Sequence, residues 1–478
     1  MSSLLAPKIA LARGVGALSR LGGGGATSVP GRVLLRLEPG ALALLAGRLP
    51  QGSVVISATN GKTTTAAMAA SILTRAGVPL VHNRAGANMA GGIATTLIGA
   101  ARPGGALAGE LGLFEVDEFW LAQMVLQLQP RAVLLGNLFR DQLDRYGELE
   151  AIADRWAAVL ADGGRRAELV LNADDPLVAD LGRARERVLY FGVEDRALAM
   201  SGMAHAADAK HCRRCGAPYT FDVVLLGHLG HYRCAACGQE RPRPSVYARE
   251  VSLDGVRGAR FELCTPAGET PVALALPGLY NVYNALGATA LALSLGVGLG
   301  EIAEGLQTAQ AAFGRAERVA LARADRGGGR GGGGGGGERE LRILLVKNPA
   351  GANEVLRTLA LEPGDHDLLV VLNDKVADGR DVSWIWDADF ELLASRVRRL
   401  TCAGTRAAEL ALRFKYAGVE RERIALEGDL ARALDLAAAG GAQDGGTPTP
   451  LYVLPTYTAL LALRRLLVAR GDTREQFS

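Results

Sequence analysis

Apolar and polar positions alternate in a regular rhythm through most of the chain. Short runs rich in Val, Ile and Leu are separated by longer Ala- and Leu-rich stretches with helical spacing. This rhythm predicts α/β layers built on parallel sheets, because each strand is followed by a stretch long enough to form a crossover helix. In the first part of the chain, strands are expected at Ser53–Ser57, Leu111–Val116, Ala132–Leu135, Leu169–Asn172 and Val188–Phe191.

A second α/β rhythm follows residues 326–338, which are almost pure Gly with Arg. Such a segment cannot offset its ordering entropy, and it predicts a linker. The apolar runs beyond it predict a separate Rossmann-like domain, with helices at Thr405–Tyr416 and Thr456–Val468. Its strands are expected at Leu341–Val346, Leu368–Leu372, Arg399–Cys402, Ile424–Leu426 and Leu451–Leu454. The expected organisation is an N-terminal segment 1–40, a central domain 41–325 with an insert at 203–245, the linker 326–338 and a C-terminal domain 339–478.

Composition narrows the class of protein. The 478 residues are 49% hydrophobic and 22% charged, which is typical of a globular chain with about three domains. Lys+Arg 53 against Asp+Glu 50 leaves no strong basic field, so a nucleic-acid partner is not expected. The N-terminal stretch Met1–Leu21 is interrupted by Lys8 and Arg13 and has no cleavage pattern. We expect it to be a helix packed on the first domain, in preference to one lying on a membrane surface, and we expect a cytoplasmic protein without a transmembrane helix.

The strongest chemical signal is the segment Ser57–Thr65, which reads Ser-Ala-Thr-Asn-Gly-Lys-Thr-Thr-Thr. It lies between an apolar strand and an Ala-rich helix, which is the setting of a phosphate-binding loop. Ile56 stands where the strict Walker pattern has its first glycine, and a Thr-rich turn that caps a helix is the alternative. Lys62 is expected to neutralise phosphate oxygens and Thr63 to ligate Mg²⁺. The predicted ATP-binding residues of this loop are Thr59, Asn60, Gly61, Lys62, Thr63 and Thr64.

A run of carboxylates ends the next predicted strand. Because ligands bind at the carboxyl edge of an open α/β sheet, we expect Glu115 to hold the Mg²⁺ ion. Asp117 or Glu118 alone is about as consistent with a solvated loop charge as with a role at the metal.

Four of the six cysteines form two Cys-x-x-Cys pairs, 18 residues apart and each followed by Gly. This spacing predicts a structural Zn²⁺ ribbon with four thiolate ligands, and redox dithiols are the less favoured alternative. His211, His228 and His231 lie nearby but are surplus to such a site, and Cys264 and Cys402 are expected to be buried apolar residues. The predicted Zn²⁺ ligands are Cys212, Cys215, Cys234 and Cys237.

Several longer segments, together with the loop and Glu115, carry a resemblance to a known family. They are Asn137–Gly147, Leu171–Pro176, Pro277–Ala285 and Phe313–Glu317. Together they resemble the central ATPase domain of the Mur ligases, which activate a carboxylate with ATP and join it to an amine. Three further features resemble the MurT-type ligase subunits of lipid II isoglutaminyl synthase within that superfamily. They are Asn83–Met89, the cysteine insert, and the C-terminal segments Lys347–Gly351 and Ala377–Asp387.

The resemblance implies a Mur-ligase-like central P-loop ATPase domain with a zinc-ribbon insert, followed by a MurT-type C-terminal domain. It implies ATP-dependent amidation of the α-carboxylate of D-glutamate in the lipid II peptide stem, through an acyl phosphate, in peptidoglycan synthesis. Asn281 and Asn284 are then expected near adenine, Arg315 near the phosphates or the hinge, and Arg84 and Asn88 at the substrate. Whether lipid II or a soluble precursor is preferred stays open, and contact with the inner membrane face follows only from a lipid-linked substrate.

The sequence differs from the amino-acid-adding Mur ligases at positions that bear on which amine is the substrate. Gln142 and Tyr280 replace family histidines, and no Lys lies between Lys62 and Lys210 to carry the carbamate of those enzymes. A second Mg²⁺ site is therefore in doubt, and ammonia as the amine fits the changed site. A Mur ligase proper or a folylpolyglutamate-synthase-like ligase is the alternative enzyme, and a nucleotide-dependent scaffold is the alternative of another class.

The source of ammonia is expected to be a second subunit. The chain has no Gly-x-Cys-x-Gly elbow for glutamine hydrolysis, and the resemblance implies a GatD-type glutaminase as partner. The resemblance also implies that an Asp of the C-terminal domain orients the partner's catalytic His. We favour Asp381 over Asp374, Asp378 and Asp387. Trp384 and Trp386 are expected to share one strand face, as core or interface residues.

Overall fold

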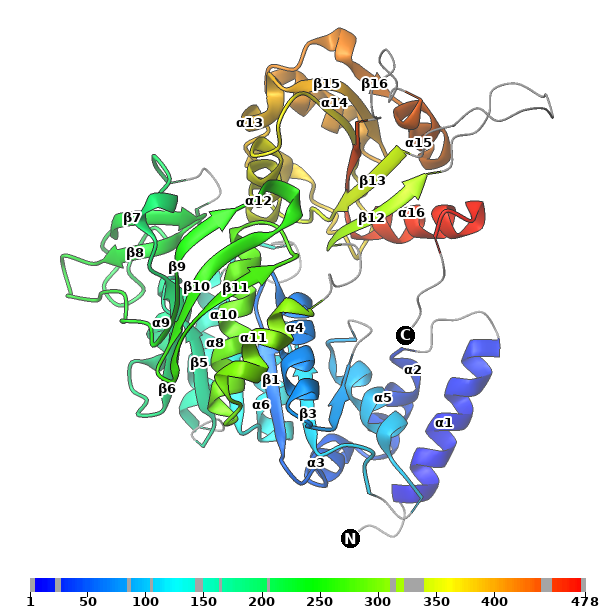
Figure 1. Cartoon of the computed structure of the whole chain (residues 1–478). Helices are drawn as coiled ribbons and strands as arrows, with labels where there is room; N and C mark the ends of the chain where they lie inside the picture. The colour runs from blue at the N-terminus through cyan, green and yellow to red at the C-terminus, as the bar shows by residue number, and fades with distance from the viewer. Residues whose placement is uncertain are drawn as a thin grey trace.

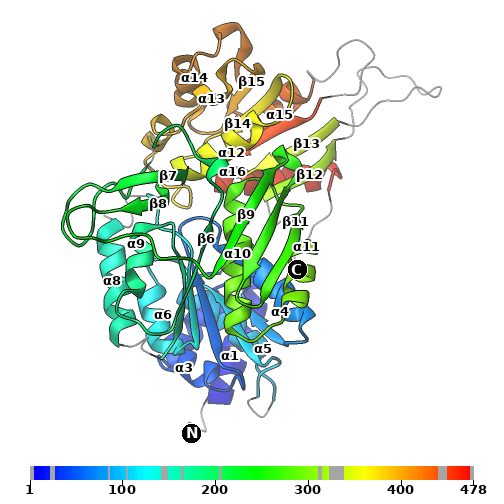
Figure 2. The ribbon, with the colours of Figure 1, turned by 60° about the vertical axis from the view of Figure 1, so that its left-hand side comes forward.

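The computed structural model describes residues 5–21, 27–83, 87–103, 106–141, 149–162, 166–203, 207–309, 315–321, 339–439 and 449–473. Two large sheets with helices on both faces account for most of these residues, and a small two-stranded sheet lies to one side (Figures 1 and 2). The domain built on the second sheet lies over one end of the first domain (Figure 1). Residues of both domains line a cavity between them.

The first sheet has nine strands in the order β11-β10-β9-β6-β5-β4-β1-β3-β2. Pairing is parallel from β2 through to β9 and antiparallel between β9, β10 and β11. Its parallel strands are β1 (Ser53–Ser57), β2 (Leu80–His82), β3 (Leu111–Glu115), β4 (Ala132–Leu135), β5 (Glu168–Asn172), β6 (Val188–Val193) and β9 (Val246–Leu253). The outer strands are β10 (Ala259–Thr265) and β11 (Gly268–Leu274).

The five strands predicted in the first part of the chain correspond to β1, β3, β4, β5 and β6. Strands β1, β3 and β4 are buried throughout, and β5 and β6 are buried over most or half of their length, which is why continuous apolar runs revealed them. The predicted parallel pairing does not extend to one edge of this sheet, where β9, β10 and β11 form an antiparallel meander. Those strands alternate exposed and buried positions, a weaker signal than an apolar run.

Helices cover both faces of this sheet and divide its core in two. On one face lie α4 (Lys62–Arg75), α10 (Leu279–Ser294) and α11 (Leu299–Gln307). The other face carries α1 (Leu5–Leu21), α2 (Val29–Leu37), α3 (Ala41–Ala46), α5 (Ala90–Ala100), α6 (Leu121–Leu128), α8 (Leu149–Asp162) and α9 (Pro176–Ala179). Leu5 and Ile9 of α1 are buried in the second core, and Lys8 pairs with Glu38 at 2.9 Å. The predicted packing of an N-terminal helix on the first domain is therefore confirmed for α1.

The second sheet has the order β12-β13-β17-β14-β15-β16 and is parallel except for β12. Its strands are β12 (Arg315–Leu321), β13 (Arg339–Leu344), β14 (His366–Val371), β15 (Val397–Ala403), β16 (Ile424–Leu426) and β17 (Leu451–Pro455). The core on one face includes α12 (Pro349–Ala360), α13 (Glu391–Ala394) and α14 (Ala407–Tyr416), and the other face carries α15 (Leu430–Ala438) and α16 (Tyr457–Arg470). The α/β rhythm predicted beyond the Gly-rich segment is present, while residues 326–338 lie outside the described part of the chain.

The remaining elements are short. Strands β7 (Thr220–Leu226) and β8 (Leu229–Arg233) form the two-stranded sheet inside the cysteine insert. Single 3₁₀ turns are η1 (Asp180–Gly182), η2 (Arg196–Leu198), η3 (Gly255–Arg257), η4 (Ser383–Trp386) and η5 (Arg421–Arg423). Within the described ranges, no helix combines the length and the apolar character needed to cross a bilayer.

Candidate functional site

The predicted phosphate loop leaves the carboxyl end of β1 and enters α4. Gly61 stands before the first residue of the helix with φ 88°, a left-handed conformation that favours glycine. A Cβ atom on Gly61 would lie 2.0 Å from Asn284 Oδ1, so a larger residue would also clash with α10. In the described part of the chain no side chain caps this helix start. The amide groups of the first turn, including half-buried Thr63 and buried Thr64, are therefore suited to an anion.

Lys62 is buried at the start of α4, and its ammonium group faces carboxylates. Its Nζ donates to Glu118 Oε2 at 2.8 Å and to the backbone oxygen of Ala58 at 2.6 Å. Burial alone would lower the pKa of Lys62, but the charges of Glu118, Asp117 and Glu115 outweigh it and raise the pKa above 10.5. The side chain is therefore a fixed positive charge at the loop.

Glu115 ends β3 with its side chain 3% exposed. The side-chain amide of Asn83 bonds both backbone groups of Glu115. Asn83 Oδ1 accepts from Glu115 N at 2.9 Å, and Asn83 Nδ2 donates to Glu115 O at 2.8 Å. Asn88 Nδ2 donates to Glu115 Oε1 at 3.4 Å. The structure thus brings the predicted Mg²⁺ ligand next to one predicted substrate residue. The other, Arg84, lies outside the described residues.

Asp117 and Glu118 are not solvated loop charges, so that interpretation is wrong for both. They are 8% and 5% exposed. Burial raises the pKa of Asp117, and the neighbouring charge of Glu118 adds to the effect. Burial also acts to raise the pKa of Glu118, but the Lys62 ammonium prevails and the pKa is lowered. The burial of these two residues could not be predicted, because a run of acidic residues in the sequence does not show whether a counter-ion lies nearby in the fold.

Asn137, at the carboxyl edge beyond β4, braces the loop and was not among the predicted site residues. Its Oδ1 accepts from Asn60 N at 2.9 Å, its Nδ2 donates to Asn60 O at 3.0 Å, and its backbone oxygen accepts from Thr59 N at 2.9 Å. Thr59 Oγ1 in turn accepts from Phe139 N at 3.1 Å. The position of Asn137 just past a buried apolar strand was the available signal.

Asn281 and Asn284 lie in the first turns of α10, directly against the loop. Asn284 Oδ1 accepts from Thr65 Oγ1 at 3.1 Å, and Asn284 Nδ2 donates to Asn281 Oδ1 at 3.0 Å. Asn281 Nδ2 donates to the backbone oxygen of Pro277 at 2.7 Å. Asn284 lines the cavity between the sheets, together with Gly61. Arg315 opens β12, and its side chain lies outside the described residues.

The C-terminal domain reaches this loop from the other side of the cavity. Lys347 Nζ donates to the backbone oxygen of Thr59 at 3.1 Å and also pairs with Asp141. Asn348 Nδ2 donates to Asn60 Oδ1 at 3.0 Å, and Asn348 also caps α12. Glu354 of α12 lines the same cavity, and burial raises its pKa. A cavity shared by both domains, with the loop at one end, fits a ligand that bridges them.

The four candidate aspartates of the C-terminal domain have different surroundings. Asp378 is buried and accepts from the backbone and hydroxyl of Thr458. Asp374 accepts from Thr405, and Asp387 lies 3.5 Å from Arg140 of the central domain. Asp381 is exposed, and its Oδ1 accepts from Ser383 N at 2.8 Å. That bond lowers the pKa of Asp381, so it is a carboxylate at neutral pH.

Trp384 and Trp386 do not share a strand face, because they lie in the 3₁₀ turn η4. Trp384 is half-buried against the core, while Trp386 is exposed and lies beside Tyr416, with ring centroids 5.9 Å apart. Ser383 N, at the first residue of this turn, donates to Asp381 Oδ1. This bond stabilises the loop that precedes η4.

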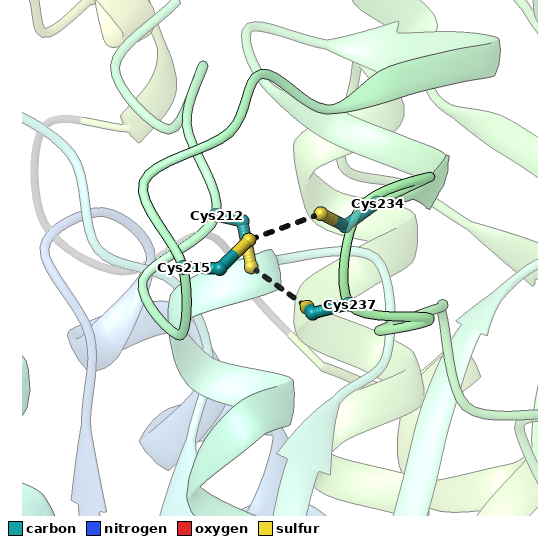
Figure 3. A group of neighbouring side chains, drawn as sticks. All are labelled: Cys212, Cys215, Cys234 and Cys237. Carbon is teal, nitrogen blue, oxygen red and sulfur yellow. Dashed lines mark hydrogen bonds between the residues drawn. The ribbon is translucent and has the colours of Figure 1, made fainter.

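The four cysteines converge as predicted (Figure 3). All four Sγ atoms lie within 4.8 Å of one another, with Cys212 to Cys237 and Cys215 to Cys234 both at 3.5 Å. Gly216 and Gly238 follow the two pairs with φ 76° and 73°, and each donates its N–H back to the first cysteine of its pair. Each pair thus forms a tight knuckle.

The donor set suits Zn²⁺. In a tetrahedral four-thiolate site, with Zn–S bonds of about 2.3 Å, the sulfur atoms lie roughly 3.8 Å apart. The observed spacing is close to this and far from a disulfide bond. The surrounding histidines make other contacts: His231 Nε2 lies 3.0 Å from the backbone oxygen of Val193, and His228 packs on Phe139. Cys264 and Cys402 are buried and lie apart from the cluster, as expected.

Comparison with known proteins places the chain in a family. Residues 56–237 match the Mur ligase middle domain, and residues 345–460 match the MurT ligase C-terminal domain. Among solved structures, a pseudomurein peptide ligase type C from Methanothermus fervidus shares the fold, with TM-score 0.63 at 23% identity, covering 88% of this chain and 79% of that one.

Curated relatives match over most of their length. The chain is 32% identical over 466 residues to the lipid II isoglutaminyl synthase (glutamine-hydrolyzing) subunit MurT of Streptococcus pneumoniae, covering 96% of both chains. It is 33% identical over 403 residues to the subunit of the same name in Staphylococcus aureus, covering 84% of this chain and 85% of the relative. On these matches and the shared fold, the chain belongs to the family of MurT ligase subunits.

Proposed function

We propose that this chain amidates the α-carboxylate of D-glutamate in the lipid II peptide stem, giving D-isoglutamine, with ATP as the energy source and a partner subunit as the source of ammonia. The family membership supports a glutamine-using ligase. The observation that carries the proposal is the loop at Gly61 and Lys62, where Lys62 is buried and paired with Glu118 and where Lys347 reaches the loop from the second domain. This is the arrangement that phosphoryl transfer to a carboxylate requires.

ATP would lie in the cavity with its phosphates on the amide groups of Gly61 to Thr64. The substrate carboxylate attacks the γ-phosphorus, ADP leaves, and an acyl phosphate forms. Ammonia then attacks the acyl carbon, inorganic phosphate leaves, and the amide remains. Lys62 would supply positive charge to the transferred group by exchanging its contact with Glu118 for phosphate oxygens.

Thr63 and Glu115 are the residues that would hold Mg²⁺. When bound, the ion would neutralise phosphate charge during transfer. Asn88, bonded to Glu115, would meet the substrate carboxylate near the γ-phosphate. Lys347 and Asn348 would keep the C-terminal domain closed over the cavity, which protects an acyl phosphate from water. Arg84, Arg315 and the adenine contacts of Asn281 and Asn284 remain proposed roles.

The partner is proposed to be a GatD-type glutaminase. Asp381 is the candidate that best fits the role of orienting the partner's histidine, since it is exposed and ionised while Asp378 is committed to Thr458. The reaction is assigned to the cytoplasm, where ATP and nucleotide-linked precursors are available. Any contact with the membrane would come through the lipid of the substrate.

The test is co-purification with a candidate glutaminase, followed by mass spectrometry of a muropeptide incubated with ATP and glutamine, ammonium or L-amino acids. The proposal expects an amide with glutamine only when the partner is present, and with ammonium in its absence. An amino-acid-adding ligase, the alternative activity, would instead lengthen the peptide. The absence of carbamate-bearing lysine between Lys62 and Lys210 favours the first outcome.

A further inference from the structure

One wall of the cavity comes from the cysteine insert, and it is apolar. At the tip of the β7–β8 hairpin, Leu226 pairs opposite Leu229, and both side chains are buried and line the cavity. Phe139 continues the same wall. Asn60 and Gly61, at the start of α4, belong to the lining of the same cavity. For a nucleotide whose phosphates lie at that helix start, the leucines and Phe139 offer an apolar surface on which a face of the base can pack.

The hairpin tip is fitted closely to the sheet edge beneath it. His228, at the turn, is fully buried, and its ring centroid lies 4.5 Å from that of Phe139. His228 Nε2 lies 3.4 Å from Asp175 Oδ2. Gly227, with φ 58°, has no room for a side chain, because a Cβ atom would lie 2.8 Å from the Phe139 ring. The position of the tip therefore also sets the position of Phe139.

A second connection runs from the end of the insert to the cavity. Arg241, four residues after Cys237, donates from Nε to Asp174 Oδ1 at 2.5 Å. Asp174 Oδ2 accepts from the hydroxyl of Tyr283 at 2.6 Å, and Tyr283 lines the cavity. Both Asp174 and Tyr283 are buried, so this chain of bonds is shielded from solvent.

The hairpin strands of the insert pack into the large core of the first sheet through Val223, Leu225, Leu226 and Leu229. The cysteine knuckle region has little more to hold it together. Its own core is a small cluster that includes Tyr219 and Tyr232 with Cys212 and Cys234. An isolated two-stranded hairpin is marginally stable in water, and small metal-binding units take much of their folding free energy from the ion. The thiolate cluster is therefore the source of order for the knuckles, and Cys234 follows directly on β8, whose other end forms the hairpin tip.

We propose that the cysteine insert is a working part of the nucleotide site: Leu226 and Leu229 form the wall against which the base packs, and a metal ion held by the four thiolates keeps that wall in place. Metal occupancy of the insert then sets the affinity for ATP, although the ion lies outside the cavity. The inference rests on the proposed function, in which this cavity takes ATP.

The test measures ATP affinity by titration calorimetry on the full-length, Zn²⁺-loaded chain with Mg²⁺ present. Leu229→Ala removes part of the wall and should raise the Kd roughly tenfold. Val224→Ala, in the same hairpin but away from the cavity, is the matched control and should change the Kd less than about twofold. Bound zinc per chain, measured alongside, should be unchanged in both variants.

Removal of zinc by a strong chelator should raise the Kd at least as much as Leu229→Ala, and readdition of zinc should restore it. Circular dichroism confirms that the large sheets remain folded. The inference is overturned if the zinc-free, folded chain binds ATP as tightly as the loaded one, if Leu229→Ala is without effect, or if Val224→Ala matches it. Failure of the loaded wild-type chain to bind ATP would instead contradict the proposed function.

Discussion

The loop at β1–α4 and the segment around Asp381 are both predicted functional regions, but they are built in opposite ways. At the loop, Lys62 is buried with Glu118 as counter-ion, and Asn137 fixes the backbone of Asn60. Asp381 is exposed and bonded to the start of a single 3₁₀ turn. The first region is assembled within this chain, while the second presents a carboxylate to its surroundings.

This difference is consistent with the proposed division of the reaction between two subunits. A buried, charge-paired loop suits chemistry that must exclude water, such as the formation of an acyl phosphate. An exposed and ionised aspartate, held by its own turn, suits a contact completed by another protein. The two regions should therefore respond differently when the nitrogen source is changed.

The largest effect is expected for Lys62→Ala. Loss of the buried charge should reduce amidation at least about 1000-fold with either glutamine or ammonium, because phosphoryl transfer itself is impaired. Amide formation is followed by mass spectrometry, and partner binding by co-purification should be retained. Lys415→Ala, at an exposed position in α14, is the control. Substantial amidation by Lys62→Ala would place the chemistry elsewhere.

Asp381→Asn should separate the two regions. With glutamine and the partner present, amidation should fall about 100-fold, since the partner's histidine loses its orienting carboxylate. With ammonium, the rate should stay at the wild-type value. Asp374→Asn, which alters a half-buried carboxylate bonded to Thr405, serves as the matched control. An equal loss with ammonium would show that Asp381 acts in the ligase reaction instead.

The loop was predictable because its signal is local. An apolar strand, a glycine and a lysine followed by threonines occur within a dozen residues, and the strand–loop–helix setting follows from the same stretch. The knuckles of the cysteine insert were predictable for the same reason, with Gly216 and Gly238 at the positive φ that their turns require. Continuous apolar runs likewise located most parallel strands.

What was missed depends on residues far apart in the chain. Glu118 can be buried because it is paired with Lys62 of another element. Glu354 lines the cavity because its domain meets the central domain there. The spacing of Trp384 and Trp386 fitted a strand, but the hydrogen bond from Ser383 to Asp381 favours a 3₁₀ turn there. Pairings of this kind are set by tertiary contacts, which periodicity does not report.

Glu118→Gln tests the buried pair by stability. Removing the carboxylate should lower the free energy of unfolding by about 2 kcal/mol, because Lys62 loses its closest counter-ion. The pKa of Glu118 is lowered in the folded chain, so its contribution is fully present above the ordinary value of 4.5 and is lost as the pH falls through the folded value. Urea unfolding at several pH values should show that the gap in unfolding free energy between Glu118→Gln and wild type narrows only below the ordinary pKa of the glutamate. A gap that instead widens toward acid pH would contradict the assigned direction.

The smallest effect is expected for Asp387→Asn. Its 3.5 Å contact with Arg140 is partly exposed, so its loss should change stability by less than about 1 kcal/mol. Glutamine-dependent amidation should stay within about twofold of wild type, as expected of a rim contact. A loss as large as that of Asp381→Asn would transfer the orienting role to Asp387.

The central claim is that this chain uses ATP at the Lys62 loop to make a carboxylate reactive toward ammonia. The most direct measurement is mass spectrometry of a D-glutamate-containing muropeptide after incubation of the chain with ATP, Mg²⁺ and ¹⁵N-ammonium. The account predicts ¹⁵N in an amide at the α-carboxylate, formed in step with ADP and absent in Lys62→Ala. ATP consumption without amide, or amide formation that continues in Lys62→Ala, would contradict it.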